Sequence, residues 1–366
     1  MSIFPREVMS GNGAKGFKDV EARVLAGERL SAEDGAALFQ ATNLPWLALL
    51  ADTVRRRKCP EREVTYVIGR IINYTNVCWV KCSFCAFYRL PGHQEGYVLS
   101  REEIFQKIQE LVDHGGTEVL LQGGLNPALK IDYFEDTFRA IKECFPVHIH
   151  GLSPAELIYL AKVSQLSLRE TLLRLKAAGL GSIPGGGAEI LVDEVRQDIA
   201  PLKDTVEEWL DCMRTGHQVG IPSSATMMFG SVETAEQRVA HLLQLRALQD
   251  ETKGFTAFVA WNFQPAGTEL GGKRASAFDY LRTMAVARLM LDNFDNIQAS
   301  WLTQGPKVAQ IALHYGVNDL GSTIFEERVV SAGGAKFMAA REEIERVIVD
   351  AGYMPRVRNT RYEILQ

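Results

Sequence analysis

The sequence predicts an α/β protein built as a (β/α)8 barrel of the TIM type, preceded by an N-terminal helical extension. From Val64 onward, short apolar stretches alternate with longer stretches in which apolar residues repeat at helical spacing, a pattern typical of βαβ units and a parallel sheet. Eight such repeats follow one another, and eight parallel strands can close into a barrel. An open barrel of six strands is the alternative.

The expected strands are short and separated by turn residues. They cover residues 64–74, 117–121, 147–150, 180–183, 223–229, 255–263, 297–302 and 322–329. Capping boxes at Ser100–Glu103 and Ser167–Glu170 each open a helix. Pro154, at a first helical position, opens another, in which Glu156 is expected to cap Ser153. Further helices are expected at 131–144, 205–219, 234–252, 276–292, 306–315 and 335–351.

The chain divides into three predicted regions. Residues 1–60 form an N-terminal helical cap, 61–335 the barrel, and 336–366 a C-terminal helix and polar tail. In the cap, helices are expected near 19–28, after Ser31, and at 44–57. The basic run 55–58 is expected to be a solvated helix end.

Composition excludes several classes of protein. The chain has 366 residues, 46% of them hydrophobic, and a net charge of −5 with a pI near 5.9. A mildly acidic balance argues against nucleic acid or an anionic membrane as the main partner. No apolar run approaches the length of a membrane span, and no signal pattern opens the chain, so a cytoplasmic location is expected. Cys59, Cys144 and Cys212 are expected to be free thiols.

Three cysteines lie within eight residues, at Cys78, Cys82 and Cys85, with the spacing Cys-x3-Cys-x2-Cys. Thiolates select zinc, copper(I) or iron–sulfur clusters. A structural zinc site would normally complete its tetrahedron with a fourth nearby ligand, and the next histidine is His93, beyond a Pro-Gly turn. A [4Fe–4S] cluster takes one cysteine per iron, so three cysteines would leave one iron open. A structural zinc loop remains the alternative.

Other unusual residues follow the predicted strands, at the end where barrels carry their catalytic groups. They are Gln122-Gly123-Gly124, His148, His150, Ser153, the glycines at 185–187, Met227, Met228, the segment 261–265, Thr303 and Gln304. Their expected convergence at one mouth of the barrel indicates an active site there.

The triplet, with Phe84 before its last cysteine, resembles the signature of the radical S-adenosylmethionine (SAM) superfamily. That resemblance implies a [4Fe–4S] cluster on Cys78, Cys82 and Cys85, with SAM bound to the open iron. Gly123-Gly124 resembles the glycine pair that holds the SAM amino group, beside Gln122 and Ser153. The stretch from Gly181 through Ile183 to Gly185 resembles the strand that packs against adenine. Phe84 resembles the position whose backbone contacts the adenine. Tyr88 is expected either to line the same cavity or to pack in the core, and Glu189 to face either SAM or solvent.

Three longer stretches of the sequence resemble one subgroup of this superfamily. Residues 72–89, 148–156 and 183–191 resemble the subgroup that acts in menaquinone and deazaflavin biosynthesis, and within it the dehypoxanthine futalosine cyclases. The segment Trp261-Asn-Phe-Gln-Pro265 favours the cyclases. Aminofutalosine synthase and deazaflavin (FO) synthase types are the alternatives, and a non-catalytic zinc-binding barrel is the alternative outside the class. Gly69, Ile71 and Gly181 depart from the subgroup, where Asp, Asn and Asp are common.

The resemblance implies the chemistry. A flavodoxin- or ferredoxin-type donor reduces the cluster, SAM yields a 5′-deoxyadenosyl radical, and that radical removes hydrogen from C4′ of a nucleoside-derived substrate. The carbon radical then adds to a benzoate ring, and loss of an electron and a proton restores aromaticity. His150 and His148 share one strand face and are the candidate bases, His150 first. Each could equally be a hydrogen-bonded core histidine. Arg70 or Arg89 could bind a substrate carboxylate or form a structural ion pair.

Overall fold

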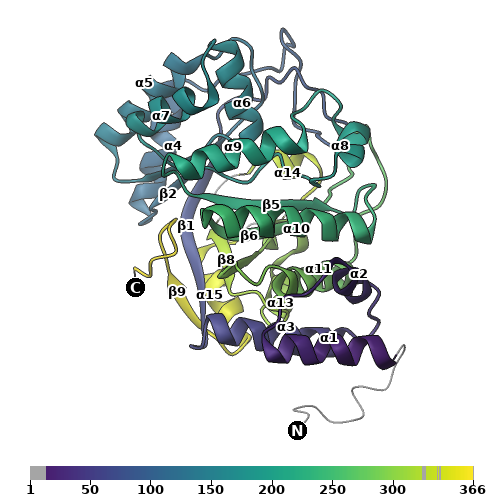
Figure 1. Ribbon diagram of the computed structural model, residues 1–366. Helices are drawn as coiled ribbons and strands as arrows, with labels where there is room; N and C mark the ends of the chain where they lie inside the picture. Colours follow the sequence, from purple (N-terminus) through teal and green to yellow (C-terminus); the bar gives the residue numbers. More distant parts are fainter. Residues whose placement is uncertain (1–13, 324–326, 336, 338, 366) are drawn as a thin grey trace.

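The computed structural model describes residues 14–323, 327–335, 337 and 339–365. Eight parallel strands form a nearly closed barrel in the order β4-β3-β2-β1-β8-β7-β6-β5 (Figure 1). A parallel bridge between Ile183 and Ser223 joins the β4 edge to the β5 edge. The strands are β1 (Glu63–Asn73), β2 (Glu118–Gln122), β3 (His148–Gly151), β4 (Leu180–Ser182), β5 (Ser223–Phe229), β6 (Phe255–Asn262), β7 (Asn296–Ala299), β8 (Asp319–Thr323) and β9 (Met354–Val357).

Helices cover the outside of the barrel. The N-terminal ones are α1 (Ala14–Ala26), α2 (Ala32–Phe39) and α3 (Leu44–Lys58). Those between strands are α4 (Arg101–Asp113), α5 (Ile131–Cys144), α6 (Pro154–Val163), α7 (Leu168–Ala178), α8 (Asp193–Ile199), α9 (Val206–Gln218), α10 (Ala235–Thr252), α11 (Ala277–Met290), α12 (Trp301–Gln304) and α13 (Pro306–Ala312). α14 (Val329–Ala332) and α15 (Arg341–Asp350) follow β8.

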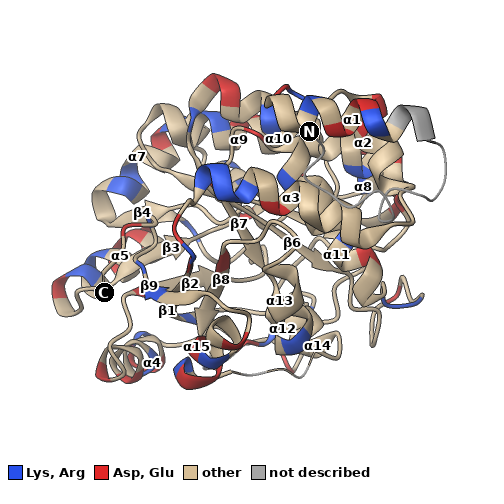
Figure 2. Ribbon diagram, turned by 90° about the horizontal axis from the view of Figure 1, so that it is seen from below, with Lys and Arg blue, Asp and Glu red and all other residues tan. Residues whose placement is uncertain are grey.

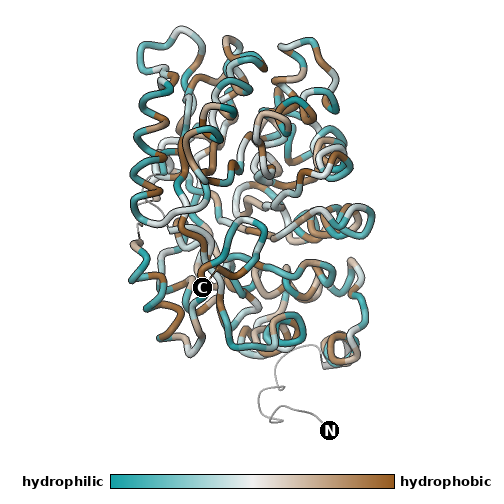
Figure 3. The backbone as a smooth tube through the Cα atoms, turned by 90° about the vertical axis from the view of Figure 1, so that its left-hand side faces the viewer, coloured by the Kyte–Doolittle hydropathy of each residue, from teal (hydrophilic) through white to brown (hydrophobic). Residues whose placement is uncertain are grey.

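Local sequence sets these boundaries. In α4, the Glu103 N–H donates to Ser100 Oγ at 3.2 Å and the Ser100 N–H donates to Glu103 Oε2 at 2.7 Å, so the predicted capping box is confirmed. Gly179 ends α7 with a φ of 121°, a backbone conformation that favours glycine. The apolar face of α4 (Ile104, Ile108, Leu111) is buried. In Figure 3 the tube changes repeatedly between hydrophilic and hydrophobic colours along the helices, as expected for helices with one buried face.

The structure adds helices that the sequence does not predict, α8, α12 and α14, and it changes the expected bounds of three other elements. The seventh strand ends at Ala299, because the Ser300 N–H donates to Tyr280 Oη at 2.8 Å and residues 301–304 turn into α12. The eighth strand covers Asp319–Thr323 rather than 322–329, of which 324–326 lie outside the described residues. α15 begins at Arg341 rather than at 335.

The tail is not merely polar chain, because β9 pairs in parallel with the first residues of β1. Pro355 lies in this four-residue strand, and a strand at a sheet edge tolerates proline because one of its sides needs no hydrogen bonds. β9 delivers the residues after Val357 to the open lower end of the barrel.

The N-terminal helices lie against the barrel's helical layer, α3 on α11 and α2 on α10 (Figure 1). The expectation of a solvated basic end to α3 was wrong at Arg55, which is 1% exposed and donates to the carbonyls of Val317 and Glu63. Arg55 thereby ties α3 to the barrel. The three-region division of the chain remains a prediction, and residues 1–13 of its first region lie outside the described residues.

Charges of both signs are interspersed over the outer helices (Figure 2). Among the described residues, none of the helices combines the length and apolar character needed to cross a bilayer. All six cysteines are free thiols, as expected for Cys59, Cys144 and Cys212.

Candidate active site

Two cavities of similar size adjoin inside the barrel. One, of about 240 Å³, lies under the loops that follow β1, β2 and β6, and we call it the upper cavity. The other, of about 230 Å³, extends into the barrel among inward-facing strand residues, and we call it the lower cavity. Gln122, Gly186 and Trp261 line both. A molecule in the upper cavity would therefore lie next to a molecule in the lower one.

The loop after β1 brings Cys78, Cys82 and Cys85 to the wall of the upper cavity. Backbone hydrogen bonds shape this loop, from the Cys78 N–H to Arg89 O at 2.9 Å and from the Cys85 N–H to Cys82 O at 3.1 Å. In the described part of the chain, no three His, Cys, Asp or Glu side chains lie close enough together to hold a single metal ion. Burial raises the pKa of the Cys82 thiol to about 12, so this thiol keeps its proton at pH 7. A metal centre binds the thiolate, so binding would release that proton.

The turn after β2 is held by Glu156 from α6. The Gly123 N–H donates to Glu156 Oε1 at 2.9 Å, and Tyr74 donates to the same oxygen at 2.6 Å. The other oxygen accepts from the N–H and the hydroxyl of Ser153 at 2.8 and 2.6 Å. Glu156 therefore caps α6, as predicted, and also fixes the glycine turn, which the sequence did not reveal. Gly124 passes so close to the cysteine loop that a Cβ there would come within 2.3 Å of Val77 O.

Glu189 and Lys203 form an ion pair in the wall of the upper cavity, with 2.6 Å between Lys203 Nζ and Glu189 Oε1. Glu189 is 7% exposed, so it is not the solvated cap that was one of its two expected roles. Its φ of 42° is unusual for a residue other than glycine. Its second oxygen, Oε2, is buried and has no hydrogen-bond partner among the described residues. Lys203 Nζ lies 5.6 Å from the centre of the Phe84 ring.

The upper cavity holds most of the predicted cofactor residues. Besides the three cysteines, it is lined by Phe84, Tyr88, Gln122, Gly123, Gly124 and Ser153. Ile183 and Gly185 lie behind the wall: Ile183 is fully buried, and the Gly185 N–H donates to Ser224 Oγ at 3.1 Å. The neighbouring Gly186 lines both cavities instead, where a Cβ would come within 2.6 Å of Gln122 Nε2. Met228, Trp261, Asn262 and Gln264 line the upper cavity, whereas Thr303 and Gln304 line neither cavity.

The lower cavity contains His150, whose Nδ1 lies 2.6 Å from Ser182 Oγ. The Nε2 of His148 lies 2.7 Å from the same oxygen. Burial lowers the pKa of His150 to about 3 and that of His148 to about 4, so both rings are neutral at pH 7. Glu118, opposite His148 in the β2–β3 register, also lines this cavity. No pattern in the sequence singles out Ser182 or Glu118, because each is an ordinary residue of a predicted strand.

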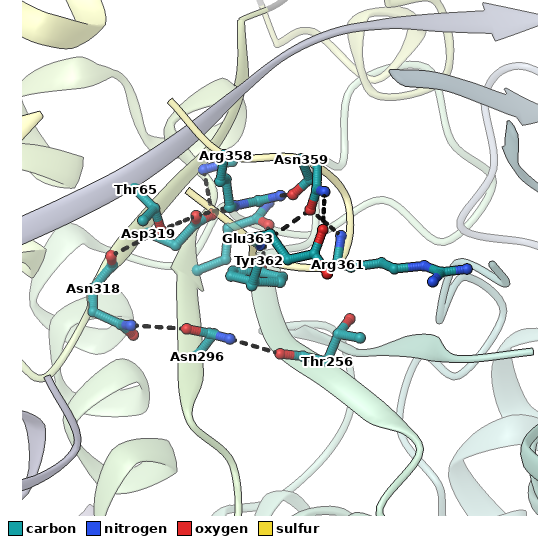
Figure 4. Close-up of polar contacts among 12 residues, drawn as sticks. Thr65, Thr256, Asn296, Asn318, Asp319, Arg358, Asn359, Arg361, Tyr362 and Glu363 are labelled. Atoms are coloured by element: carbon teal, nitrogen blue, oxygen red, sulfur yellow. Dashed lines mark hydrogen bonds and ion pairs between the residues drawn. The ribbon is translucent and has the colours of Figure 1, made fainter. Parts of the chain in front are cut away.

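The residues after β9 form the floor of the lower cavity. The Arg358 Nε and Nη2 donate to Asp319 at 2.5 and 2.9 Å, and the guanidinium lies 3.8 Å from the centre of the Tyr362 ring (Figure 4). Asp319 also accepts from Thr65 Oγ1 at 2.6 Å. Arg358, Thr360 and Tyr362 line the cavity. The tail therefore closes the barrel from below.

The two arginines considered for a substrate carboxylate form ion pairs within the protein. Arg70 pairs with Glu110 of α4 at 2.5 Å, and Arg89 pairs with Glu95 at 2.7 Å.

The donors present fit an iron–sulfur cluster with SAM. The upper cavity offers three thiols on one loop and a glycine turn fixed beside them. It also offers a buried carboxylate oxygen of Glu189 that no residue in the described part of the chain bonds. A chain with this donor set at the mouth of a parallel barrel is an enzyme of the cluster-dependent radical class.

Comparison with known families agrees with this class. Residues 72–245 match the family model of the radical SAM superfamily, and residues 252–366 match the CofH/MqnC C-terminal region. The chain belongs to the radical SAM superfamily, whose enzymes use a [4Fe–4S] cluster and SAM.

Relatives cover nearly the whole chain. A cyclic dehypoxanthine futalosine synthase of Halalkalibacterium halodurans is 48% identical over 94% of this chain and 94% of that protein. The protein of the same name from Streptomyces coelicolor is 44% identical, over 94% of this chain and 87% of its own. An aminodeoxyfutalosine synthase of Thermus thermophilus is 41% identical over 94% of both chains. Among solved structures, methylornithine synthase (PylB) has the same fold, with a TM-score of 0.73, 21% identity and coverage of 92% of this chain and 97% of its own.

Proposed function

We propose that this enzyme converts dehypoxanthine futalosine to cyclic dehypoxanthine futalosine, joining C4′ of the ribose to the benzoate ring. The observation that carries the proposal is the sequence identity of 48% and 44%, over almost the full chain, to two enzymes named for that product. The aminodeoxyfutalosine synthase, at 41%, is the second candidate. The cluster and SAM supply the radical that removes hydrogen from the substrate.

The two adjoining cavities support this assignment. We propose that Cys78, Cys82 and Cys85 hold the cluster and that SAM lies in the upper cavity, between the Gly123 turn and Glu189. The substrate would then occupy the lower cavity, against Gln122 and Trp261 at the shared boundary. The protein's work is to position the substrate and exclude water, since a carbon radical attacks any C–H bond within reach.

We further propose that His150 accepts the proton that the substrate loses when its ring regains aromaticity. His150 is neutral at pH 7 and lines the lower cavity, so it has a free electron pair to offer there. The electron donor is proposed to be a flavodoxin or ferredoxin, and the reaction is proposed to take place in the cytoplasm.

An anaerobic assay tests the proposal. The reconstituted enzyme, with SAM, a reductant and dehypoxanthine futalosine, is expected to form the cyclised product and 5′-deoxyadenosine together. Formation of 5′-deoxyadenosine without cyclised product would reject the substrate. Iron and sulfide analysis of the variants Cys78→Ala, Cys82→Ala and Cys85→Ala tests the cluster ligands: each is expected to lose iron, whereas Cys144→Ala, on the exposed end of α5, is expected to keep it.

A further inference from the structure

Ser182 lies between two histidines. Its Oγ is 2.6 Å from His150 Nδ1 and 2.7 Å from His148 Nε2. A hydroxyl has one proton to donate, so at most one of the two ring nitrogens can accept it and the other must carry a proton of its own. The tautomers of the two rings are therefore coupled through Ser182, which is itself only 3% exposed.

Glu118 adds a charge at the far end of this chain of hydrogen bonds. It is 8% exposed, lines the lower cavity, and makes no hydrogen bond or ion pair through its carboxylate with any described residue. It pairs in register with His148, and its charge favours the protonated form of that ring. Its Oε1 packs over Gly69, where a Cβ would come within 3.4 Å of it and within 2.6 Å of Ser322 Oγ.

The charges around the two rings differ. The charge that faces His150 is the Arg358 cation, which disfavours a positive charge on that ring. After burial, the largest influence on His148 is its neighbour His150, which disfavours a charge on His148 when His150 is itself charged. The Glu118 carboxylate comes next and favours that charge, and the more weakly acting cations Arg361 and Lys142 disfavour it. A positive charge is thus better placed on His148 than on His150, although His150 is the ring that lines the cavity.

We propose that Ser182 is a positioning residue that relays a proton from His150 to His148, where Glu118 stabilises the resulting charge. This inference rests on the proposed function, since it assigns the exit route of the proton that the substrate loses.

The relay balances. The bond between the substrate and its proton breaks and leaves its electron pair on the substrate, while an N–H bond forms at His150 Nε2. The N–H bond at His150 Nδ1 breaks toward Ser182 Oγ, and the Ser182 hydroxyl proton moves to His148 Nε2. His150 ends neutral in its other tautomer and His148 ends as the cation beside Glu118. The relay itself oxidises and reduces nothing.

The chain offers a matched control in a second buried serine–histidine pair. Ser223 Oγ, on the neighbouring strand β5, lies 2.7 Å from His217 Nε2 of α9, and neither residue lines the upper or the lower cavity. Ser223→Ala removes a bond of the same kind and burial without touching the relay.

The first test reads the tautomers without any activity. Long-range ¹H–¹⁵N spectra of the cluster-free protein with labelled histidines are expected to show complementary tautomers at His148 and His150. Ser182→Ala is expected to shift the ring nitrogens of both, and Ser223→Ala only those of His217. If both rings carry their proton on the nitrogen that faces Ser182, or if Ser182→Ala shifts neither ring, the relay is wrong.

The second test uses the loaded enzyme. Ser182→Ala is expected to keep 5′-deoxyadenosine formation within about twofold and to lower cyclised product about a hundredfold, a typical loss for acid–base catalysis. Ser182→Thr, which keeps the hydroxyl, is expected to restore most of it, and Glu118→Gln to lower product about tenfold. Equal product from Ser182→Ala and wild type would overturn the relay alone. Absence of cyclised product from the wild type would overturn the proposed function, and the spectra would still test the coupling. If Ser182→Ala does not fold, Ser182→Thr and Glu118→Gln carry the test.

Discussion

The imidazole of His148 covers the backbone of Gly181. A Cβ at Gly181 would come within 2.4 Å of His148 Cε1 and 2.7 Å of its Nε2, so no other residue fits beneath the ring in this position. Gly181 is one of the positions at which the sequence departs from the family it resembles. The structure gives that departure a steric reason, because glycine creates the room in which His148 reaches Ser182.

We expect Gly181→Ala to displace the His148 ring and to destabilise the protein by about 1–3 kcal/mol, the usual cost of overfilling a packed site. Because the displaced ring would lose Ser182, cyclised product per 5′-deoxyadenosine is expected to fall. Urea unfolding and the product ratio check both effects. The matched control is Gly151→Ala on the adjacent strand, where a Cβ would come no closer than 3.3 Å to another atom. This account would be contradicted by a Gly181→Ala variant that is as stable as Gly151→Ala and forms as much cyclised product per 5′-deoxyadenosine.

The second prediction concerns the ion pair under the lower cavity. Arg358 and Asp319 are 3% and 0% exposed, so removing either partner leaves a buried charge uncompensated. Arg358→Met and Asp319→Asn are each expected to lower the free energy of unfolding by about 3–5 kcal/mol. The double variant Arg358→Met/Asp319→Asn is expected to recover much of the loss, because it removes both charges together.

Urea unfolding of the cluster-free protein measures these differences. The control is Arg346→Ala, which breaks an exposed pair with Asp350 on α15 and is expected to change stability by less than about 1 kcal/mol. Losses that add up in the double variant would show that the two side chains do not act as a pair.

Sequence patterns were sufficient for the strands and helices whose signals are local. The capping box at Ser100, the glycine that ends α7 and the strand Ser223–Phe229 lie where expected. The predicted parallel barrel is confirmed, because the alternation of strand and helix leaves few other arrangements for the chain.

What the sequence could not supply are relationships between distant residues. β9 has four residues and no hydrophobic alternation, so its strand character arises only from pairing with β1. The pairing of Arg358 with Asp319 joins residues 39 positions apart on different elements. Ser182 and Glu118 acquire a possible role only once β2, β3 and β4 lie side by side.

The third prediction is a loss of stability in mild acid. Burial lowers the pKa of His148 and His217 to about 4 and that of His150 and His241 to about 3. An unfolded histidine has a pKa near 6.5, so the unfolded chain binds more protons than the folded one below that pH. The stabilisation is therefore complete above about pH 6.5 and is lost as the pH falls toward about 4.

Each such histidine is expected to contribute a slope of about 1.4 kcal/mol per pH unit within that window. Urea unfolding of the cluster-free protein at pH 7.5, 6 and 5 measures it. His217→Gln, outside both cavities, is expected to flatten the slope by about one histidine's share, whereas His93→Gln, in an exposed loop, is expected to leave it unchanged. A stability that does not vary between pH 7.5 and 5 would contradict the prediction.

The fourth prediction separates SAM binding from cluster binding through Glu156. Its carboxylate accepts from the Gly123 N–H, the Tyr74 hydroxyl and both donors of Ser153. In Glu156→Gln, the amide NH₂ group cannot accept, so either the Gly123 turn or the Ser153 cap loses its partner. Because the proposed SAM site uses that turn, we expect SAM affinity to fall about 10–100-fold, in line with the loss of a supporting shell around a bound group.

Glu103→Gln provides the matched control, since Glu103 makes the corresponding capping bond to the Ser100 N–H on α4, and it lines neither cavity. Iron and sulfide content is expected to stay at the wild-type level in both variants, because neither carboxylate contacts the cysteine loop through any described hydrogen bond. Equilibrium dialysis measures the affinity of each reconstituted variant for SAM and distinguishes Glu156→Gln from Glu103→Gln. Equal affinities for Glu156→Gln and Glu103→Gln would mean that the Gly123 turn keeps its shape without Glu156, and the proposed SAM contact there would have to be abandoned.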